Sequence, residues 1–498
     1  MNRKEQIQKS QEQKIWDVLV IGGGASGLGV ALDAVSRGLS VCLLEKYDFG
    51  KGTSSRSTKL VHGGVRYLQQ GNISLVREAL CEREYILEKA SHIARVQPFI
   101  VPCYSWWSAL YYYIGLSVYD VLSGRKTIGG TKWLGRAEVT SRIPNMKSQG
   151  LRAGIQYMDG QFDDTRLCID LVKTIVHAGG TCVNHAGAAS LLKEEGKVVG
   201  ALVRDELSGQ EWPVQAKYVV NAAGIFTDDI VQMDTPGGRQ TIVPSRGSHL
   251  VLDQSFLGGT EAIMIPKTSD GRVLFVIPWL NKVIVGTTDE QTDKPVLEPT
   301  ATAEEVQFML ANCQRYLTKK PQLTDIEATY AGLRPLAAPA EGKQNTKEIS
   351  RGHKVIHSAS GMVSIIGGKW TTFRKMGEDV VKQIGEKYSL KLPRSKSMVI
   401  PIEKTIQHQG RRLHPALPYT DVDIERAVEK EMAMSLEDVL CRRTRSLFLS
   451  TEATAAILEE VGKKVQQMLG TTDEWLADQK KQMTELIKIY SVEKQQVQ

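Results

Sequence analysis

The chain has 498 residues, of which 42% are hydrophobic and 24% charged, and a formal net charge of +7. This length predicts two or three domains, and the composition is that of a globular protein rather than a disordered or fibrous one. The basic charge is spread without a Lys/Arg block or a nucleic-acid motif. We therefore expect no nucleic-acid partner, and the charge favours an anionic substrate, cofactor or membrane surface.

Seven cysteines are scattered singly, and none forms C-x-x-C. This spacing does not support a zinc, iron–sulfur or dithiol site, so we expect no metal. An odd, dispersed set of cysteines indicates reduced thiols, and the polar first 14 residues lack the apolar region of a cleaved signal peptide. Both observations favour the cytoplasm.

A short apolar run at 16–21 predicts a buried strand. The parts of a dinucleotide-binding unit follow it: Gly22, Gly24 and Gly27 in G-x-G-x-x-G order, a predicted helix at 25–37, a predicted strand at 39–44, and Glu45. Such glycines allow a tight turn, a close pyrophosphate and close helix packing, and the helix N-terminus attracts the anion. The later carboxylate accepts from ribose hydroxyls. This motif alone leaves NAD and FAD open.

The segment 98–122 is rich in tryptophan and tyrosine. Pro102 and Asp120 interrupt it, and it has too few long aliphatic residues for a transmembrane helix of about 20 apolar residues. It is either an aromatic helix between domains or a surface that enters a bilayer interface, where tryptophan and tyrosine are favoured.

Two further strand–glycine junctions are predicted. A strand at 217–221 precedes Ala222-Ala223-Gly224, and a strand at 362–366 precedes Gly367-Gly368 and a helix over 369–387. Between them, 242–289 alternates short strands and turns, which predicts an inserted sheet.

Beyond residue 392 the pattern changes to apolar stripes at helical spacing, which predict a helical C-terminal domain. Thr471-x-x-Glu474 predicts a capping box that opens the last helix.

The run GTSSRSTKLVHGGVRYL at 52–68 closely resembles the flavin-facing loop of the FAD-dependent glycerol-3-phosphate dehydrogenases of the aerobic, quinone-linked type. The resemblance continues in order through four more motifs: Gly247-Ser248-His249, AGLRPL at 331–336, GGKWTTFRK at 367–375, and EDVL followed by RRTR within 437–445. It covers nearly the whole chain.

This resemblance implies an α/β fold in three parts. They are a glutathione-reductase-like Rossmann FAD domain at 12–98, 152–241 and 329–391, an inserted mixed-sheet substrate domain at 99–151 and 242–328, and a helical C-terminal cap domain at 392–498.

The resemblance also implies a flavoprotein of glycerol metabolism with noncovalent FAD. Such an oxidoreductase converts sn-glycerol 3-phosphate to dihydroxyacetone phosphate by hydride transfer to flavin N5 and passes the electrons to membrane quinone. We accordingly expect a cytoplasmic protein, peripheral on the inner face of the cytoplasmic membrane at an anionic surface, and a homodimer.

The reaction needs cations for the phosphate and a base for the alcohol proton. The residues that the chain offers for binding substrate are Arg66, Tyr67, His249, Arg334, Arg351 and Lys369, of which Arg351 has the weakest flanking match. We expect His249, His62, Arg334 and Lys369 to be catalytic. Whether His249 or His62 is the base stays open, because the ordinary pKa of either histidine suits the role.

The FAD-binding residues are predicted from the glycine turn, the flavin-facing loop and the two later junctions. They are Gly22, Gly24, Ala25, Ser26, Gly27, Glu45, Lys46, Thr53, Ser54, Ser55, Lys59, Leu60, His62, Gly63, Gly64, Ala223, Gly224, Gly368, Lys369, Trp370 and Thr371.

Three alternatives remain. A glycerol-3-phosphate oxidase would pass the electrons to oxygen, but the chain has no obvious added segment of the kind such oxidases carry. A related FAD oxidoreductase would act on another 2-hydroxy acid or an amino acid, without the arginines. A flavin-binding regulatory or tRNA-modifying protein would need a basic nucleic-acid surface. No second G-x-G-x-x-G is present, so a separate NAD(P) site is not expected.

Overall fold

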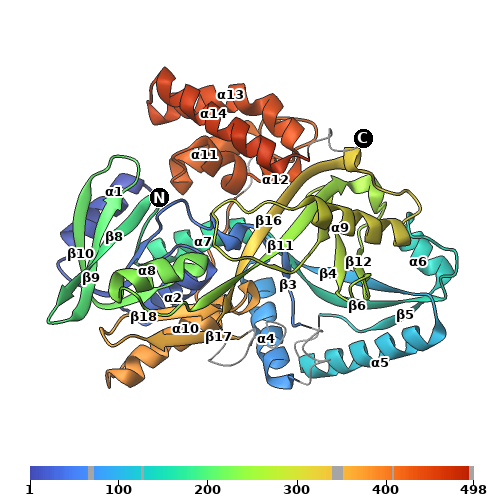
Figure 1. Cartoon of the computed structure of the whole chain (residues 1–498), viewed down its shortest axis with the longest axis horizontal. Coiled ribbons are helices and arrows are strands. Elements are labelled where there is room, and N and C mark those ends of the chain that lie inside the picture. Colours follow the sequence, from blue (N-terminus) through green and yellow to red (C-terminus); the bar gives the residue numbers. More distant parts are fainter. Residues whose placement is uncertain (65–71, 125–127, 339–351, 407–408, 493–498) are drawn as a thin grey trace.

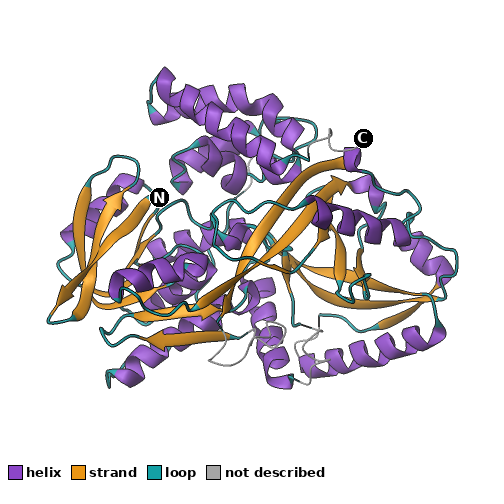
Figure 2. Ribbon diagram, viewed as in Figure 1, coloured by secondary structure: helices purple, strands orange, loops and turns teal. Residues whose placement is uncertain are grey.

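The computed structural model describes residues 1–64, 72–124, 128–338, 352–406 and 409–492. Two sheets lie side by side, and a group of helices lies across them (Figures 1 and 2). The predicted site residues Arg66, Tyr67 and Arg351 lie outside the described residues.

The smaller sheet has the order β17-β18-β10-β1-β2-β7, with β8 and β9 attached beyond β10. Its strands are β1 Trp16–Ile21, β2 Val41–Leu44, β7 Thr181–Val183, β8 Ala186–Glu194, β9 Lys197–Asp205, β10 Glu211–Asn221, β17 His353–His357 and β18 Val363–Gly367. The pairs β18–β10, β10–β1, β1–β2 and β2–β7 are all parallel. Such strands are covered on both faces, which explains why they are continuous apolar runs.

Helices flank this parallel sheet: α1 Arg3–Glu12, α2 Ala25–Ser36, α7 Asp164–His177, α8 Thr227–Asp234 and α10 Phe373–Lys387. The two helices that follow glycine junctions, α2 and α10, cross at Gly29 and Gly377. A Cβ on Gly29 would collide with the Phe373 carbonyl, and one on Gly377 with the Gly29 carbonyl. The second predicted junction therefore packs directly on the first.

The larger sheet has the order β15-β11-β14-β13-β12-β4-β6-β3, with β16 paired to β11 and β5 to β6. Its strands are β3 Leu60–Val61, β4 Ala94–Cys103, β5 Lys132–Gly135, β6 Ala153–Phe162, β11 Ile242–Asp253, β12 Ala262–Ile265, β13 Leu274–Trp279, β14 Lys282–Gly286, β15 Glu290–Gln291 and β16 Ile326–Ala337. The pair β12–β4 is parallel and the pairs around it are antiparallel, so the predicted mixed sheet is confirmed. Its helices are α4 Ile73–Lys89, α5 Trp106–Ser123, α6 Arg136–Arg142 and α9 Ala303–Tyr316.

The expected domain limits differ from the membership of the sheets. We expected segments up to 98, from 152 and from 329 in the FAD domain, yet β4, β6 and β16 all pair within the larger sheet. β4 and β16 each continue through an expected limit. The sequence could not show these limits, because a strand that runs from one domain into the sheet of the next has the same composition on both sides of the domain limit.

The C-terminal region contains α11 Asp421–Glu431, a π-helical turn Asp438–Arg443, α12 Ser446–Leu449, α13 Thr451–Leu469 and α14 Asp473–Tyr490. These helices lie across the top of the molecule in Figure 1. The predicted capping box Thr471-x-x-Glu474 is wrong. The N-cap is Thr472, whose hydroxyl accepts from the Trp475 amide at 3.3 Å, because Gly470 ends α13 in a left-handed conformation and moves the next helix start by one residue.

None of the helices within the described ranges is both long and apolar enough to cross a membrane.

Candidate active site

The glycine turn after β1 has the geometry of a dinucleotide cradle. Gly22 has φ +116°, and a Cβ there would collide with the Ala222 carbonyl at the end of β10. A Cβ on Gly27 would collide with the Gly22 carbonyl. The N-cap of α2, Gly24, makes no side-chain cap. The turn and the helix N-terminus therefore fit a pyrophosphate, as the motif predicts.

Glu45 lies at the end of β2, beside that turn. One carboxylate oxygen accepts from the Gly23 amide at 2.7 Å and the other from the Tyr47 amide at 2.9 Å. Burial raises the pKa of Glu45, and these two bonds oppose the rise. The carboxylate is thus held where a ribose beyond the glycine turn would lie, whereas Lys46 is exposed.

Hydrogen bonds join three motifs that are far apart in the sequence. The Ala25 amide at the start of α2 donates to Oγ of Ser54 at 2.9 Å, and Nε1 of Trp370 donates to the Ser54 carbonyl at 2.8 Å. The His62 amide donates to Oγ1 of Thr371 at 3.2 Å. The glycine turn, the flavin-facing loop and the 367–375 motif therefore form one site.

Lys59 has a different environment from the one expected of a cofactor ligand. Its ammonium is fully buried and donates to Asp164 at 2.7 Å and to the Ser55 carbonyl at 2.8 Å. Burial lowers the pKa of Lys59 to about 7 against the attraction of Asp164. The side chain of Lys59 therefore contacts other protein groups, and its contact with the cofactor stays a prediction. The side chain of Leu60 likewise packs in a core cluster of the larger sheet.

His249 lies on β11 in the register position opposite Tyr330 of β16. The two rings stack with centroids 4.5 Å apart, and Nε2 of His249 lies 2.9 Å from Oγ1 of Thr58. Burial, then Lys59 and Arg334, lower the pKa of His249 well below its ordinary value. The imidazole is therefore neutral at physiological pH, as a proton acceptor must be. The rival base, His62, is half-buried just after β3.

Arg334 follows on the same strand as Tyr330 and is about one-third exposed. It donates to Asp289 at 3.2 Å and to Oγ1 of Thr287 at 3.3 Å. Oγ1 of Thr53 donates to the Leu333 carbonyl at 2.6 Å, which attaches the flavin-facing loop to this strand beside Arg334. The predicted base and the predicted phosphate ligand therefore stand on neighbouring strands that both contact that loop.

Lys369 precedes a single turn of 3-10 helix, Trp370–Thr372, that leads into α10. It lines a hollow of about 120 Å³ together with Glu78, His353 and Thr372.

The glycines predicted around this site have left-handed backbones, with φ +62° at Gly224, +78° at Gly64 and +87° at Gly368. Ala223 lies against the glycine turn, since its Cα would contact a Cβ on Gly22. A Cβ on Gly63 would collide with Tyr119 and Leu80.

The C-terminal motif at 437–445 attaches the helical region to the cofactor side. Arg443 pairs with Asp48, three residues after Glu45, and Arg442 pairs with both Asp48 and Asp438. His185 completes a group that resembles a metal site, with Nε2 2.9 Å from Asp438. Because two arginines already neutralise these carboxylates, the cluster is an ion-pair network that joins two domains.

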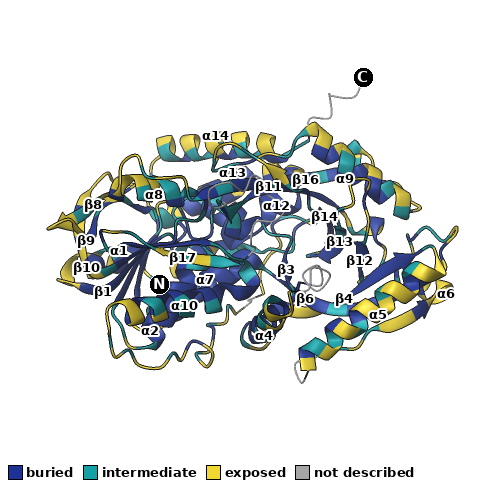
Figure 3. Ribbon diagram, turned by 60° about the horizontal axis from the view of Figure 1, so that its bottom comes forward, coloured by how far each residue is buried: buried dark blue, intermediate teal, exposed yellow. Residues whose placement is uncertain are grey.

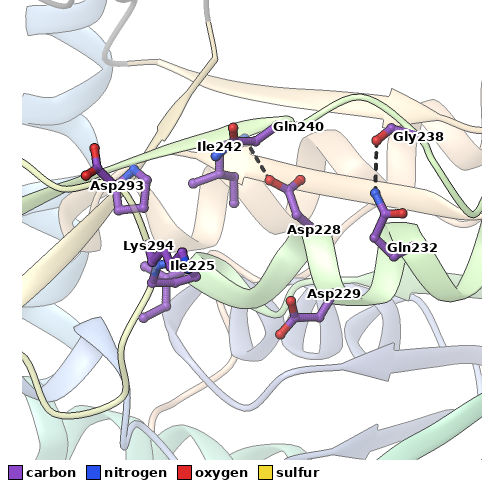
Figure 4. Close-up of a pocket in the computed structure, with 11 residues that line it drawn as sticks. Ile225, Asp228, Asp229, Gln232, Gly238, Gln240, Ile242, Asp293 and Lys294 are labelled. Carbon is purple, nitrogen blue, oxygen red and sulfur yellow. Dashed lines mark hydrogen bonds between the residues drawn. The ribbon is translucent and has the colours of Figure 1, made fainter.

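A separate hollow of about 300 Å³ lies between α8 and the chain that enters β11 (Figure 4). Asp228 accepts from the Ile242 amide at 3.3 Å, and Gln232 donates to the Gly238 carbonyl at 2.9 Å. Its residues come from α8, from the chain that enters β11 and from the loop after β15, and they belong to none of the predicted motifs.

Sequence reasoning missed several residues of this site. Thr58 lies inside the recognised loop, but nothing in the sequence showed that its hydroxyl meets His249. Sequence patterns also did not indicate Asp164, Tyr330 and Asp289. Each of them contacts a partner that is distant in the sequence, and a local motif does not record such a contact.

Comparison with known proteins shows the family of this chain. Residues 17–374 match the family model described as "FAD dependent oxidoreductase", and residues 363–476 match "C-terminal domain of alpha-glycerophosphate oxidase". The protein is thus an FAD-dependent oxidoreductase, and its glycine cradle and Glu45 fit the ADP part of that cofactor.

The relatives define the family more closely. The chain is 36% identical to a probable mitochondrial glycerol-3-phosphate dehydrogenase of Caenorhabditis elegans (94% of this chain, 72% of the relative) and 34% identical to the mitochondrial glycerol-3-phosphate dehydrogenase of Homo sapiens (97% and 74%). A glycerol-3-phosphate dehydrogenase from Bacillus halodurans, solved with FAD, aligns with a TM-score of 0.79 at 27% identity over 100% of this chain and 99% of its own. This chain belongs to the glycerol-3-phosphate dehydrogenase family.

The fold is also found in an L-alpha-glycerophosphate oxidase from Mycoplasma pneumoniae, which aligns with a TM-score of 0.60 at 15% identity over 80% of this chain and 100% of its own.

Proposed function

We propose that this protein oxidises sn-glycerol 3-phosphate to dihydroxyacetone phosphate and passes the electrons to a membrane quinone. The substrate gives up a hydride from carbon and a proton from its hydroxyl. The quinone receives the two electrons with two protons and becomes a quinol. Bound FAD supplies the acceptor for the hydride between these two half-reactions.

The observation that carries this proposal is the placement of His249 and Arg334 on β11 and β16, both joined to the flavin-facing loop through Thr58 and Thr53. Arg334 offers a planar fork to the substrate phosphate, which would replace its present partners Asp289 and Thr287. Lys369 adds a second cation from the start of the 3-10 turn.

His249 is the proposed base. Its lowered pKa keeps the imidazole neutral. Nε2 takes the hydroxyl proton as the hydride leaves, once the substrate hydroxyl has replaced Thr58 as the hydrogen-bond partner of that nitrogen. Stacking on Tyr330 holds the ring in one plane, so the nitrogen is positioned before substrate binds.

The test is anaerobic bleaching of the bound flavin, followed by its absorbance. Glycerol 3-phosphate should bleach it rapidly, whereas lactate and glycerol, which lack the phosphate, should not. Equal bleaching by lactate would overturn the substrate assignment. His249→Gln should slow bleaching far more than His62→Gln, and the reverse order would make His62 the base.

The electron acceptor needs its own measurement. Purified holoenzyme with glycerol 3-phosphate should reduce a quinone analogue much faster than it consumes oxygen. Rapid oxygen consumption with hydrogen peroxide release would instead define an oxidase. A quinone acceptor supports a peripheral location at the cytoplasmic face of the cytoplasmic membrane, and we expect a homodimer there.

A further inference from the structure

Helix α5 exposes an apolar face that nothing in the described structure covers. Large apolar side chains recur on its outer side at helical spacing: Trp107, Leu110, Tyr111, Ile114, Val118 and Val121. Trp107 is 82% exposed and Val121 78%. The helix lies along the edge of the molecule, and much of its ribbon has the colour of exposed residues in Figure 3. Globular proteins rarely leave such a stripe unless it binds something.

The inner side of the same helix is firmly attached. Ala109, Leu116 and Tyr119 are buried against the larger sheet and α4. The Tyr119 hydroxyl donates to Asp159 of β6 at 3.2 Å, and Asp159 pairs with Arg83 of α4 at 3.1 Å, all three being buried. Since a buried polar network fixes the helix, its outer stripe is a permanent surface rather than a frayed segment.

The surface extends onto β5 with residues suited to a lipid headgroup region. Trp133 stacks on Trp106 with ring centroids 6.3 Å apart, and Lys132 and Arg136, close to Trp133 in the sequence, are exposed. α5 itself carries one charged residue, Asp120, which is occupied by hydrogen bonds to Thr131. Exposed tryptophan and tyrosine with a basic margin suit the interface of an anionic bilayer.

We infer that α5 and Trp133 form the docking surface of this protein on an anionic phospholipid bilayer, with α5 lying in the interface plane. This inference deepens the proposed function, because it rests on a quinone dissolved in that membrane as acceptor.

The position of the helix gives this docking a consequence for electron transfer. Its inner face abuts the flavin-facing loop, since a Cβ on Gly63 would collide with the Tyr119 hydroxyl. An α-helix with its side chains is about 10 Å across, so docking through the outer face brings that loop within about one helix diameter of the lipid. Within the described residues, α5 therefore lies between a quinone at the interface and the flavin-facing loop.

The test is cosedimentation of the purified holoenzyme, without substrate, with vesicles of phosphatidylcholine and phosphatidylglycerol. Trp107→Glu/Ile114→Glu should weaken binding about tenfold or more, because two charges enter the interface. The matched control is Leu207→Glu/Val399→Glu, which changes two other exposed apolar residues, 48% and 69% exposed, away from α5. Lys132→Glu/Arg136→Glu should weaken binding to these vesicles and abolish their preference over phosphatidylcholine alone.

Brominated lipids should quench tryptophan fluorescence in the wild type and less in Trp107→Glu/Ile114→Glu, while FAD content and anaerobic bleaching stay unchanged. Absence of vesicle binding in the wild type would overturn the inference. So would a loss of vesicle binding in Leu207→Glu/Val399→Glu as large as the loss in Trp107→Glu/Ile114→Glu. Sedimentation velocity tests the other occupant, a second copy of the chain. If the wild type is a dimer that does not bind vesicles, and Trp107→Glu/Ile114→Glu is a monomer, the exposed face of α5 is a dimer interface. If the protein binds vesicles but glycerol 3-phosphate does not bleach its flavin, the docking surface stands and the proposed function is wrong.

Discussion

Nε2 of His249 lies 2.9 Å from Oγ1 of Thr58, so a strand of the larger sheet and the flavin-facing loop meet at one hydrogen bond. That bond sets the position of the proposed base relative to the cofactor. The rings of His249 and Tyr330 stack at 12° between planes, which restricts the imidazole in the remaining directions.

Thr58→Val should slow flavin reduction about tenfold, a cost in line with removing one positioning hydrogen bond, and leave the apparent KM for glycerol 3-phosphate nearly unchanged. Stopped-flow absorbance measures the step. Thr58→Ser keeps the hydroxyl and should restore the rate. Normal kinetics in the valine variant would mean that Thr58 has no part in positioning His249.

Arg334→Ala should raise the apparent KM for glycerol 3-phosphate by about 10- to 100-fold, because a charge-assisted contact with phosphate contributes about 1.5–3 kcal/mol. FAD content should stay the same. The matched control is Arg142→Ala, which removes a surface arginine paired with Glu138 and Glu261. An unchanged KM in Arg334→Ala would remove Arg334 from the phosphate site.

His249 should make the protein less stable in acid. Its folded pKa lies well below the ordinary 6.5, so the unfolded chain binds a proton that the folded chain does not. As pH falls below about 6.5, the free energy of unfolding should drop by up to about 1.4 kcal/mol per pH unit from this residue. Above that pH the contribution is constant. Unfolding by denaturant at several pH values should show this slope in the wild type and its loss in His249→Gln. His177→Gln, at an exposed histidine, should keep the slope.

The buried pair Lys59–Asp164 should be costly to break. Asp164→Asn removes the carboxylate that keeps the buried Lys59 amine charged, so the amine must either lose its proton or stay charged without a partner. The free energy of unfolding should fall by about 3–5 kcal/mol. Lys59→Met/Asp164→Leu removes both charges and should be less destabilised than Asp164→Asn, as measured by denaturant unfolding. If Lys59→Met/Asp164→Leu has a lower free energy of unfolding than Asp164→Asn, the ion pair itself stabilises the fold.

Gly22→Ala should give a folded protein with little FAD, because a Cβ at φ +116° would collide with the Ala222 carbonyl in the cradle. Gly115→Ala is the control, since a Cβ there meets nothing within 4 Å. Flavin absorbance per polypeptide measures the effect. Full FAD occupancy in Gly22→Ala would contradict the assignment of this turn to the pyrophosphate.

Local patterns were sufficient for the cofactor half of this protein. The first strand, the glycine turn and Glu45 are contiguous parts of one βαβ unit, so their geometry follows from short-range sterics and helix–strand packing. The apolar stripes after residue 392 likewise predicted helices, because helical periodicity is a local property.

Sequence patterns alone were enough to predict the dinucleotide unit, the aromatic segment and the set of cationic and imidazole side chains. The contacts between these parts follow from the tertiary structure: Thr58 with His249, Lys59 with Asp164, and α5 with one face on the flavin-facing loop and the other exposed. The reason is that each pairing joins segments about 100 or more residues apart or depends on which side of a helix is covered. Strand register and burial settle such contacts, and no local pattern encodes them.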